Sequence, residues 1–228
     1  MTEHNDFQSR LADLARSWVP GKGWKTLETI DAHTAGEPLR IIIAGYPEIP
    51  GTSILDRRRF LSENLDQYRR ILMWEPRGHT DMYGAVLVPS EHDEADFGVL
   101  FMHNEGYSSM CGHGIIAVTR VALEIGLVAC VHPVTGLRIE TPAGLVNSSF
   151  DANTGRTAFE NVPSFVVVLD QPVDVPTIGH VVCDLAYGGA YYVYVDAASI
   201  GLSLQLENRH EIVSVGRRIK QAVARQFQ

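Results

Sequence analysis

Apolar side chains recur every three or four residues in four parts of the chain, which is the spacing of amphipathic helices. The four segments are residues 1–18, 56–73, 112–125 and 208–227. The third segment begins directly after Cys111 and stops before Gly126, and glycine commonly follows the last residue of a helix. We therefore predict four helices, one of which starts at a cysteine.

Short runs rich in β-branched and aromatic residues lie between these segments, and such runs are typical of strands. They include "PLRIIIAG", "MYGAVLVPS", "FGVLFMH", "LRIETPAGLVNSSF", "SFVVVLD" and "AYYVYVDA". The Pro and Gly residues of "VPGKG" predict a linker between the first helix and the first strand. The chain is therefore predicted to mix strands with helices along its whole length.

The order of the first predicted elements recurs near the end of the chain. Residues 27–45 form two predicted strands around a turn of small residues, and a helix studded with basic residues follows them. Residues 180–197 and 208–227 repeat this order. We therefore predict two related units. We assign residues 1–25 to an N-terminal helix and linker, 26–175 to the first unit and 176–228 to the beginning of the second.

The formal net charge of −8 argues against partners that are themselves anionic. Binding of nucleic acid or of an anionic membrane requires a basic protein surface. Basic residues do cluster in "DRRRF", "QYRRI" and "GRRIK", and we interpret these clusters as solvated helix faces rather than anion sites. We expect neither nucleic acid nor a membrane as a partner.

The three cysteines, Cys111, Cys130 and Cys183, are too few and too widely spaced for a disulfide framework or a zinc ribbon. Reduced thiols in the cytoplasm are then the expectation. The first 18 residues lack the continuous apolar core of a signal peptide, and no apolar run approaches the length of a membrane span. We therefore expect a cytoplasmic protein.

Cys111 has the most distinctive surroundings of the three cysteines. A thiolate at a helix N-terminus is stabilised by the unpaired N–H groups of the first turn and by the helix dipole, which lowers the pKa of the thiol. Gly112 and Gly114 leave room for a ligand carboxylate to approach the same N–H groups. These residues alone leave two interpretations open: a base that acts near neutral pH, or a buried cysteine before a core helix.

Two polar segments strengthen the first interpretation. "EPRGHTDMYGA" contains Tyr83 and "MHNEGYSS" contains His103, and both segments are dense in ionisable groups between apolar strands. Such groups cost desolvation free energy unless they pair or bind a ligand. The two segments therefore favour a functional site near Cys111.

Two other chemistries are not expected at Cys111. Cys111, His113 and His103 lack the ligand spacing of a zinc site. A papain-like dyad of Cys111 and His113 is not expected either, because residues two apart on a helix point to different faces. A more distant histidine partner stays open. We predict no metal site.

These motifs resemble those of the proline racemase family, which includes hydroxyproline 2-epimerases and trans-3-hydroxy-L-proline dehydratases. The likeness extends from about residue 27 to the end of the chain and is carried by "IDAHTAGEPLRI", "EPRGHTDMYGA", "MCGHGIIA", "TPAGLV", "NVPSF" and "DLAYGGAYYVYVDA". The resemblance implies an α+β protein with the diaminopimelate-epimerase-like fold. In that fold two pseudo-symmetric lobes of curved sheet each surround a central helix, and the substrate lies between the lobes.

The resemblance also implies roles for individual residues. Cys111 matches the base that removes the α-proton of a proline-type imino acid. Gly112 and His113 match residues that hold the substrate carboxylate, and Tyr83 matches an aromatic residue beside the substrate ring. Cys130 and Cys183 match no catalytic position, and we interpret both as packing residues. The implied chemistry needs no cofactor.

The reaction within the family depends on a second residue, at the head of the second lobe's central helix, which is a cysteine in racemases and epimerases and a threonine in dehydratases. The sequence ends before this position, so we expect a truncated second lobe. The segments "HNEGYSSMCGH" and "EPRGHTDMYGAVLVPSE" resemble the dehydratases more than the racemases. We therefore expect dehydration of trans-3-hydroxy-L-proline to pyrroline-2-carboxylate. A proline racemase, a 4-hydroxyproline 2-epimerase and an inactive family member are the alternatives.

A small imino acid is the partner that the resemblance implies. A homodimer is compatible with the sequence, which does not determine the oligomeric state. Because the lobe that would face Cys111 is expected to be incomplete, we expect no more than trace activity from these 228 residues alone, and self-association through unpaired strand edges.

Overall fold

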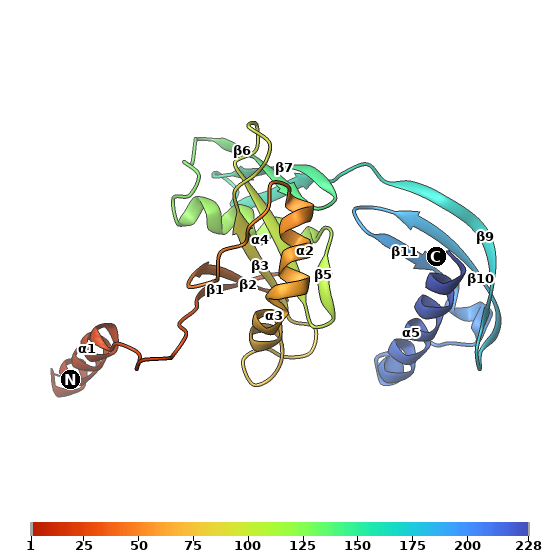
Figure 1. Cartoon of the computed structure of the whole chain (residues 1–228), viewed down its shortest axis with the longest axis horizontal. Coiled ribbons are helices and arrows are strands. Elements are labelled where there is room, and N and C mark those ends of the chain that lie inside the picture. The colour runs from red at the N-terminus through yellow and green to blue at the C-terminus, as the bar shows by residue number, and fades with distance from the viewer. Residues whose placement is uncertain (1, 228) are drawn as a thin grey trace.

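Two β-sheets form the framework of the molecule (Figure 1). The computed structural model describes residues 2–227. The larger sheet has eight strands in the order β1-β2-β3-β4-β6-β7-β8, with β5 paired to β4, and the smaller sheet has the order β11-β10-β9. The strands are β1 (Glu28–Thr34), β2 (Glu37–Ala44), β3 (Tyr83–Val88), β4 (Phe97–His103), β5 (Gly106–Ser108), β6 (Val134–Thr141), β7 (Gly144–Asp151), β8 (Arg156–Glu160), β9 (Phe165–Val175), β10 (Gly179–Tyr187) and β11 (Tyr191–Tyr194).

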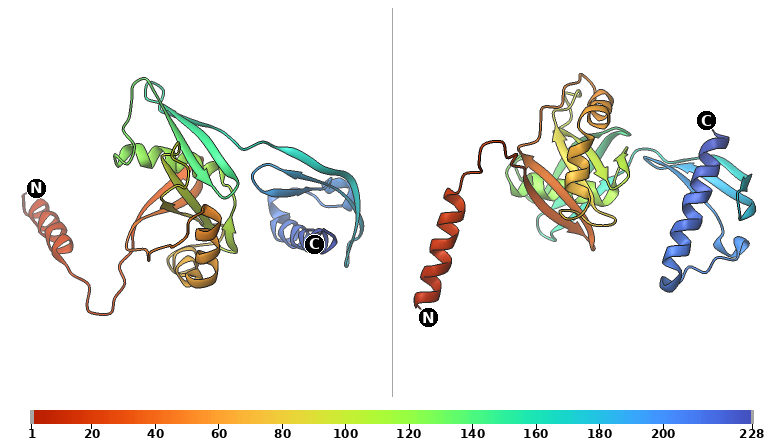
Figure 2. Two further views of the ribbon diagram at one scale, coloured as in Figure 1. Left: turned by 45° about the horizontal axis from the view of Figure 1, so that its top comes forward. Right: turned by 60° about the horizontal axis from the view of Figure 1, so that its bottom comes forward.

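Helices flank both sheets, so the α+β class is confirmed. The helices are α1 (Thr2–Ser17), α2 (Ile54–Asn64), α3 (Asp66–Met73), α4 (Gly112–Glu124) and α5 (Arg209–Gln226). In all three views α1 stands away from the sheets at the end of an extended linker (Figures 1 and 2). The predicted first helix and linker are therefore both present. None of the helices between residues 2 and 227 combines the length and the apolar character that crossing a lipid bilayer requires.

The helix predicted over residues 56–73 is interrupted at Leu65. This residue ends α2 and precedes α3, with φ −123° and ψ 11°. The interruption allows two short helices to cover one face of the sheet, where Leu61 of α2 and Leu72 of α3 enter the same apolar cluster. Periodicity did not reveal the break because neither Pro nor Gly marks it.

Strand β4 forms the centre of the core because both of its faces are covered. Val99 and Phe101 face α4, whereas Leu100 and Met102 face α2 and α3, and each is at most 1% exposed. Successive side chains of a strand point to opposite faces of the sheet. This explains why the sequence of β4 is apolar without alternation.

The second unit repeats the start of the first, as its sequence predicts. The antiparallel pair β10–β11 is followed by α5, as β1–β2 is followed by α2. Residues Val215, Ile219 and Val223 of α5 pack on apolar residues of β9 and β10. Strand β9, which we assigned to the first unit, pairs with β10, so the smaller sheet begins at residue 165.

The two remaining cysteines differ in their surroundings. Cys183 is 2% exposed and packs in the cluster beneath α5, which confirms it as a packing residue. Cys130 is exposed, in the segment between α4 and β6. Its interpretation as a packing residue is therefore wrong, because its side chain is exposed to solvent in this connecting segment.

Candidate active site

Cys111 lies at the point where α4 begins. It is the N-cap residue, with an extended backbone (φ −147°, ψ 108°), and its carbonyl oxygen accepts the hydrogen bond from the N–H of Ile115 at 2.9 Å. Gly126, with φ 76°, follows the end of the helix as predicted. The side chain of Cys111 therefore stands beside the first-turn N–H groups that have no helical partner. It is nevertheless only 7% exposed.

The two glycines that follow Cys111 are required by close neighbours. A Cβ atom on Gly114 would lie 2.5 Å from Cε1 of Phe101 and 3.0 Å from Sγ of Cys111. A Cβ atom on Gly112 would lie 3.0 Å from Cζ of Phe159. The missing side chains let the start of the helix pack tightly against these two phenylalanine rings and the Cys111 sulfur.

His113 contacts Cys111, and the expectation that these two side chains point apart is wrong. The Sγ atom of Cys111 lies 3.4 Å from Nδ1 of His113 and 3.7 Å from Nε2. The expectation treated both residues as helical, whereas Cys111 has an extended backbone that turns its side chain over the first helical turn. The structure therefore places a nitrogen base within reach of the thiol.

The protonation state of Cys111 also differs from expectation. Burial raises the pKa of the thiol to about 11; the N–H of Gly114 that faces the sulfur opposes this, and Glu37 adds to it. The lowered pKa expected from the helix N-terminus is therefore wrong, because desolvation of a charged sulfur outweighs its backbone hydrogen bond. Without a ligand the thiol is protonated at neutral pH.

Tyr83, at the start of β3, connects the cysteine to the two polar segments. Its ring meets that of His113 edge to face, with centroids 4.9 Å apart, and lies 5.3 Å from the ring of His103. Burial and the neighbouring Cys111 raise the pKa of Tyr83, in that order of importance. All four residues expected at the site, Tyr83, Cys111, Gly112 and His113, are therefore neighbours.

Two turns from other parts of the chain enclose the start of α4. The hydroxyl of Thr34, in the β1–β2 hairpin, donates to the carbonyl of His113 at 3.0 Å. The β10–β11 turn of the second unit contacts the segment between β5 and α4. There the hydroxyl of Ser109 donates to the carbonyl of Gly189. Asn161 anchors this turn further by donating to the carbonyl of Gly188 at 2.9 Å.

A cavity of about 570 Å³ lies next to Tyr83, between the first unit and α5. Its lining combines both polar segments with two cations of α5, and includes Trp74, His79, Asp81, Tyr83, His103, Glu105, Arg217 and Lys220. Arg217 pairs with Glu105 at 3.0 Å, and Lys220 lies 3.9 Å from the same carboxylate. The polar segments therefore meet each other and the second unit.

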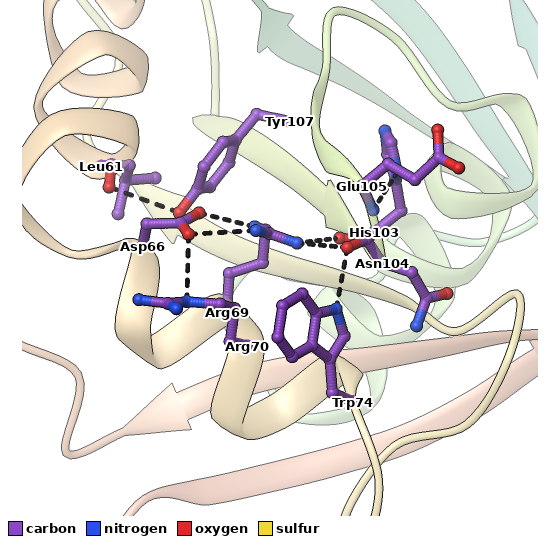
Figure 3. A network of polar contacts seen from close by, with 9 residues as sticks. All are labelled: Leu61, Asp66, Arg69, Arg70, Trp74, His103, Asn104, Glu105 and Tyr107. Atoms are coloured by element: carbon purple, nitrogen blue, oxygen red, sulfur yellow. Dashed lines mark hydrogen bonds and ion pairs between the residues drawn. The ribbon is translucent and has the colours of Figure 1, made fainter.

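Two basic clusters that we interpreted as solvated helix faces, "QYRRI" and "GRRIK", contribute residues to the region around this cavity. Arg69, in "QYRRI", is 6% exposed rather than solvated, and it holds the turn that carries His103 and Glu105 (Figure 3). Arg217, in "GRRIK", pairs with that turn. The sequence did contain one indication that Arg69 is paired rather than solvated. Asp66 stands three residues before it and therefore on the same helix face.

Three residues whose ligand atoms are close enough to share a metal ion lie away from Cys111. Within the described part of the chain, Glu91, His92 and Glu140 have ligand atoms within 4.8 Å of one another. Glu91 and His92 follow β3 at the end opposite Tyr83, and Glu140 lies in β6. Glu140 already accepts hydrogen bonds from the hydroxyl of Ser90 at 2.6 Å and from the N–H of Glu91 at 3.0 Å. Cys111, His113 and His103 do not form such a group.

Comparison with known proteins finds relatives of similar sequence. The family model described as proline racemase matches residues 29–228. A protein of Colwellia psychrerythraea named trans-3-hydroxy-L-proline dehydratase is 47% identical over 217 residues, which cover 92% of this chain and 61% of the relative. The Homo sapiens protein of the same name is 48% identical over 214 residues, with 90% of this chain and 60% of the relative covered. The chain thus spans about three fifths of the length of these relatives.

A solved structure has the same fold. The hydroxyproline epimerase of Agrobacterium vitis, crystallised with trans-4-hydroxy-L-proline, superposes with a TM-score of 0.82 at 29% identity. The match covers 90% of this chain and 62% of the epimerase. Both sheets of this chain therefore have counterparts in one solved protein.

Proposed function

The chain belongs to the proline racemase family, and from that premise we propose that it acts in the dehydration of trans-3-hydroxy-L-proline, with Cys111 as the base. The observation that carries the proposal is the cluster at the start of α4, where Sγ of Cys111 lies 3.4 Å from Nδ1 of His113 beside the ring of Tyr83. The names of the Colwellia psychrerythraea and Homo sapiens relatives support the choice of substrate.

The proposed reaction removes one molecule of water from the substrate. The thiolate of Cys111 takes the proton from Cα, and the electrons of that C–H bond form a double bond between Cα and C3. The bond from C3 to its hydroxyl oxygen breaks, and the leaving hydroxide takes a proton from solvent to become water. Cys111 then releases the α-proton to solvent, so the thiolate is restored and the net change is the loss of one water. The product is a pyrroline carboxylate.

The buried thiol has to lose its proton before it can act. His113 is close enough to accept this proton through Nδ1. A bound imino acid would bring its cationic nitrogen into the same low-dielectric pocket, and a positive neighbour lowers the pKa of a thiol. We therefore infer that the substrate activates the base, and that Cys111 stays protonated until the substrate binds.

The substrate carboxylate has a suitable position at the first turn of α4. The N–H groups of the first turn after Cys111 have no helical partners, and such unpaired N–H groups at a helix N-terminus are suited to hold an anion. We assign carboxylate binding to Gly112 and His113, and contact with the substrate ring to Tyr83.

Incubation of the purified chain with trans-3-hydroxy-L-proline, followed by ¹H NMR, tests the proposal. At high protein concentration and over a long incubation, we expect the Cα and C3 proton signals of the substrate to give way slowly to those of a pyrroline carboxylate, in keeping with the trace activity expected of these 228 residues alone. The variant C111S keeps nearly the same size and is expected to lose the reaction, whereas C130S, at an exposed cysteine, is expected to retain it. Undiminished turnover by C111S would refute the role of Cys111.

Racemisation or epimerisation is the second candidate function, and the likeness to the epimerase of Agrobacterium vitis favours it. It begins with the same removal of the α-proton but ends with a proton added to the opposite face. In ²H₂O, inversion of trans-4-hydroxy-L-proline or of L-proline with deuterium at Cα and without loss of water would support this candidate. A pyrroline product would support the dehydratase.

A further inference from the structure

Arg69 is a buried cation on α3 whose guanidinium is saturated with acceptors. Its side chain is 7% exposed, and it forms a two-point ion pair with Asp66, with Nε 2.7 Å from Oδ1 and Nη2 3.0 Å from Oδ2. Withdrawing such a charge from water costs free energy that its partners must offset. Asp66 supplies the opposite charge, and the Arg69 side chain also keeps the pKa of Asp66 below its usual range.

The remaining edge of the Arg69 guanidinium faces the β4–β5 turn (Figure 3). Nη1 of Arg69 donates to the carbonyl oxygen of His103 at 3.0 Å and to that of Asn104 at 2.5 Å. The indole N–H of Trp74 donates to the same oxygen of Asn104 at 2.9 Å. Three N–H donors thus hold the two carbonyl groups at the tip of this turn.

The side chain of Asn104 ties the turn to the other polar segment. Its amide nitrogen donates to the carbonyl oxygen of Met73 at 2.8 Å and to that of His79 at 2.9 Å. The loop that contains His79 leads directly into β3 and Tyr83. Arg69 and Asn104 therefore fix the two loops relative to each other.

The β4–β5 turn contributes the side chains of His103 and Glu105 to the lining of the cavity. The ring of His103 lies against that of Tyr83, and its Nδ1 accepts the N–H of Glu105 at 3.2 Å, so a neutral ring carries its proton on Nε2. Glu105 points the other way and pairs with Arg217 of α5 at 3.0 Å. The position of one turn thus sets both contacts.

We propose that Arg69 is a positioning residue for the candidate active site: by holding the β4–β5 turn it keeps His103 against Tyr83, and so keeps Tyr83 beside His113 and Cys111. The kinetic part of this proposal rests on the proposed function, whereas the structural part does not. Only an arginine satisfies this geometry, because its planar fork binds Asp66 through one edge and the two carbonyls through the other, and a lysine has a single nitrogen.

The variants R69K and R70K test the proposal as a matched pair on one helix. Arg70 also pairs with Asp66, at 3.3 Å, but its side chain is 50% exposed and turns away from the β4–β5 turn. We expect R69K to lower kcat for trans-3-hydroxy-L-proline about 10- to 100-fold, because a displacement of about 1 Å at the reacting groups can cost about 100-fold, while KM changes less than about threefold. R70K is expected to behave like the unmodified chain.

A readout without turnover keeps the test independent of the proposed function. Long-range ¹H–¹⁵N NMR spectra report the tautomer of His103 in the ligand-free chain, with H103Q used to assign its signals. We expect the Nε2–H form in the unmodified chain and in R70K, and a mixture of tautomers in R69K. An R69K variant that folds and keeps both the His103 tautomer and its kcat would overturn the proposal.

A milder variant covers the case in which R69K fails to fold. W74F removes the indole donor to Asn104 but keeps an aromatic ring at a residue that is 45% exposed. We expect it to fold and to shift the His103 tautomer in the same direction as R69K, by a smaller amount. An unchanged tautomer in folded W74F, with R69K unfolded, would also count against the proposal. If turnover by these 228 residues is too low to measure, the His103 tautomer alone decides the role of Arg69.

Discussion

Cys111 and His113 are in contact, with Sγ of the thiol 3.4 Å from Nδ1 of the imidazole. The contact exists because the extended backbone of an N-cap residue turns its side chain over the helix end. It places a proton acceptor next to a thiol whose pKa is raised to about 11 by burial. In the proposed function, proton transfer from Cys111 to His113 would convert the resting thiol into the base.

The reactivity of Cys111 should depend steeply on pH. Only the thiolate reacts with iodoacetamide, so a thiol with a pKa of about 11 should be alkylated about ten times faster for each pH unit between 7 and 10. The measurement is peptide mapping by mass spectrometry in a C130S background, because exposed Cys130 would otherwise consume the reagent. A rate at Cys111 that is already constant above pH 7 would contradict the raised pKa.

The same pKa shift predicts a loss of stability at high pH. The folded-state pKa of Cys111 lies above the value of an exposed thiol, 9.0, so the unfolded chain releases the thiol proton first. The contribution of Cys111 is fully present below pH 9 and is lost as the pH rises toward 11. Urea unfolding of the unmodified chain and of C111S at pH 8 and pH 10.5 measures it, and we expect the fall in stability to be smaller in C111S.

Substitution of Gly114 should destabilise the helix start, whereas the same change in α5 should not. G114A would place a methyl group 2.5 Å from Phe101 and 3.0 Å from the Cys111 sulfur, and overpacking of this kind costs about 1–3 kcal/mol. The control is G216A, at an exposed helical position where a Cβ atom meets nothing within 4 Å. Since alanine is the better helix former, G216A should stabilise by up to about 1 kcal/mol. Thermal and urea unfolding measure the stability of both variants. Equal changes in stability for G114A and G216A would show that packing at Gly114 is unimportant.

Removal of the Tyr83 ring should weaken the site more than removal of its hydroxyl. Y83L abolishes the aromatic contacts with His113 and His103, and because each such pair contributes about 0.5–1.5 kcal/mol, we expect kcat/KM for trans-3-hydroxy-L-proline to fall about tenfold or more. Y83F keeps both contacts and should lose much less. Steady-state kinetics of the two variants distinguishes these outcomes, and equal losses would assign the effect to the hydroxyl.

Glu140 is a buried carboxylate whose role should be structural. It is 1% exposed and binds the hydroxyl of Ser90 and the N–H of Glu91 through Oε2. E140A removes the acceptor of both hydrogen bonds and leaves a gap at a buried position, at a cost of about 1–3 kcal/mol. E160A, at an exposed residue of β8, is the control and should lie within about 0.5 kcal/mol of the unmodified chain. Urea unfolding of the two variants measures the difference.

The elements of the fold were largely determined by local sequence. Apolar residues at helical spacing, β-branched runs and the glycine after α4 predicted most helices and strands, because these features act over a few residues and depend little on distant neighbours. The start of α4 at Cys111, with its two glycines, was visible for the same reason. So was the recurrence of strand, turn, strand and helix in the second unit.

Tertiary structure decided which polar groups are buried and which are in contact. The basic residues of "QYRRI" have the same local pattern, but only Arg69 faces the β4–β5 turn, which lies more than 30 residues away in the sequence. The pKa of Cys111 likewise depends on how completely the packed sheet removes water from its sulfur. Periodicity predicts which face of an element is apolar, whereas desolvation and long-range hydrogen bonds depend on what the fold places against that face.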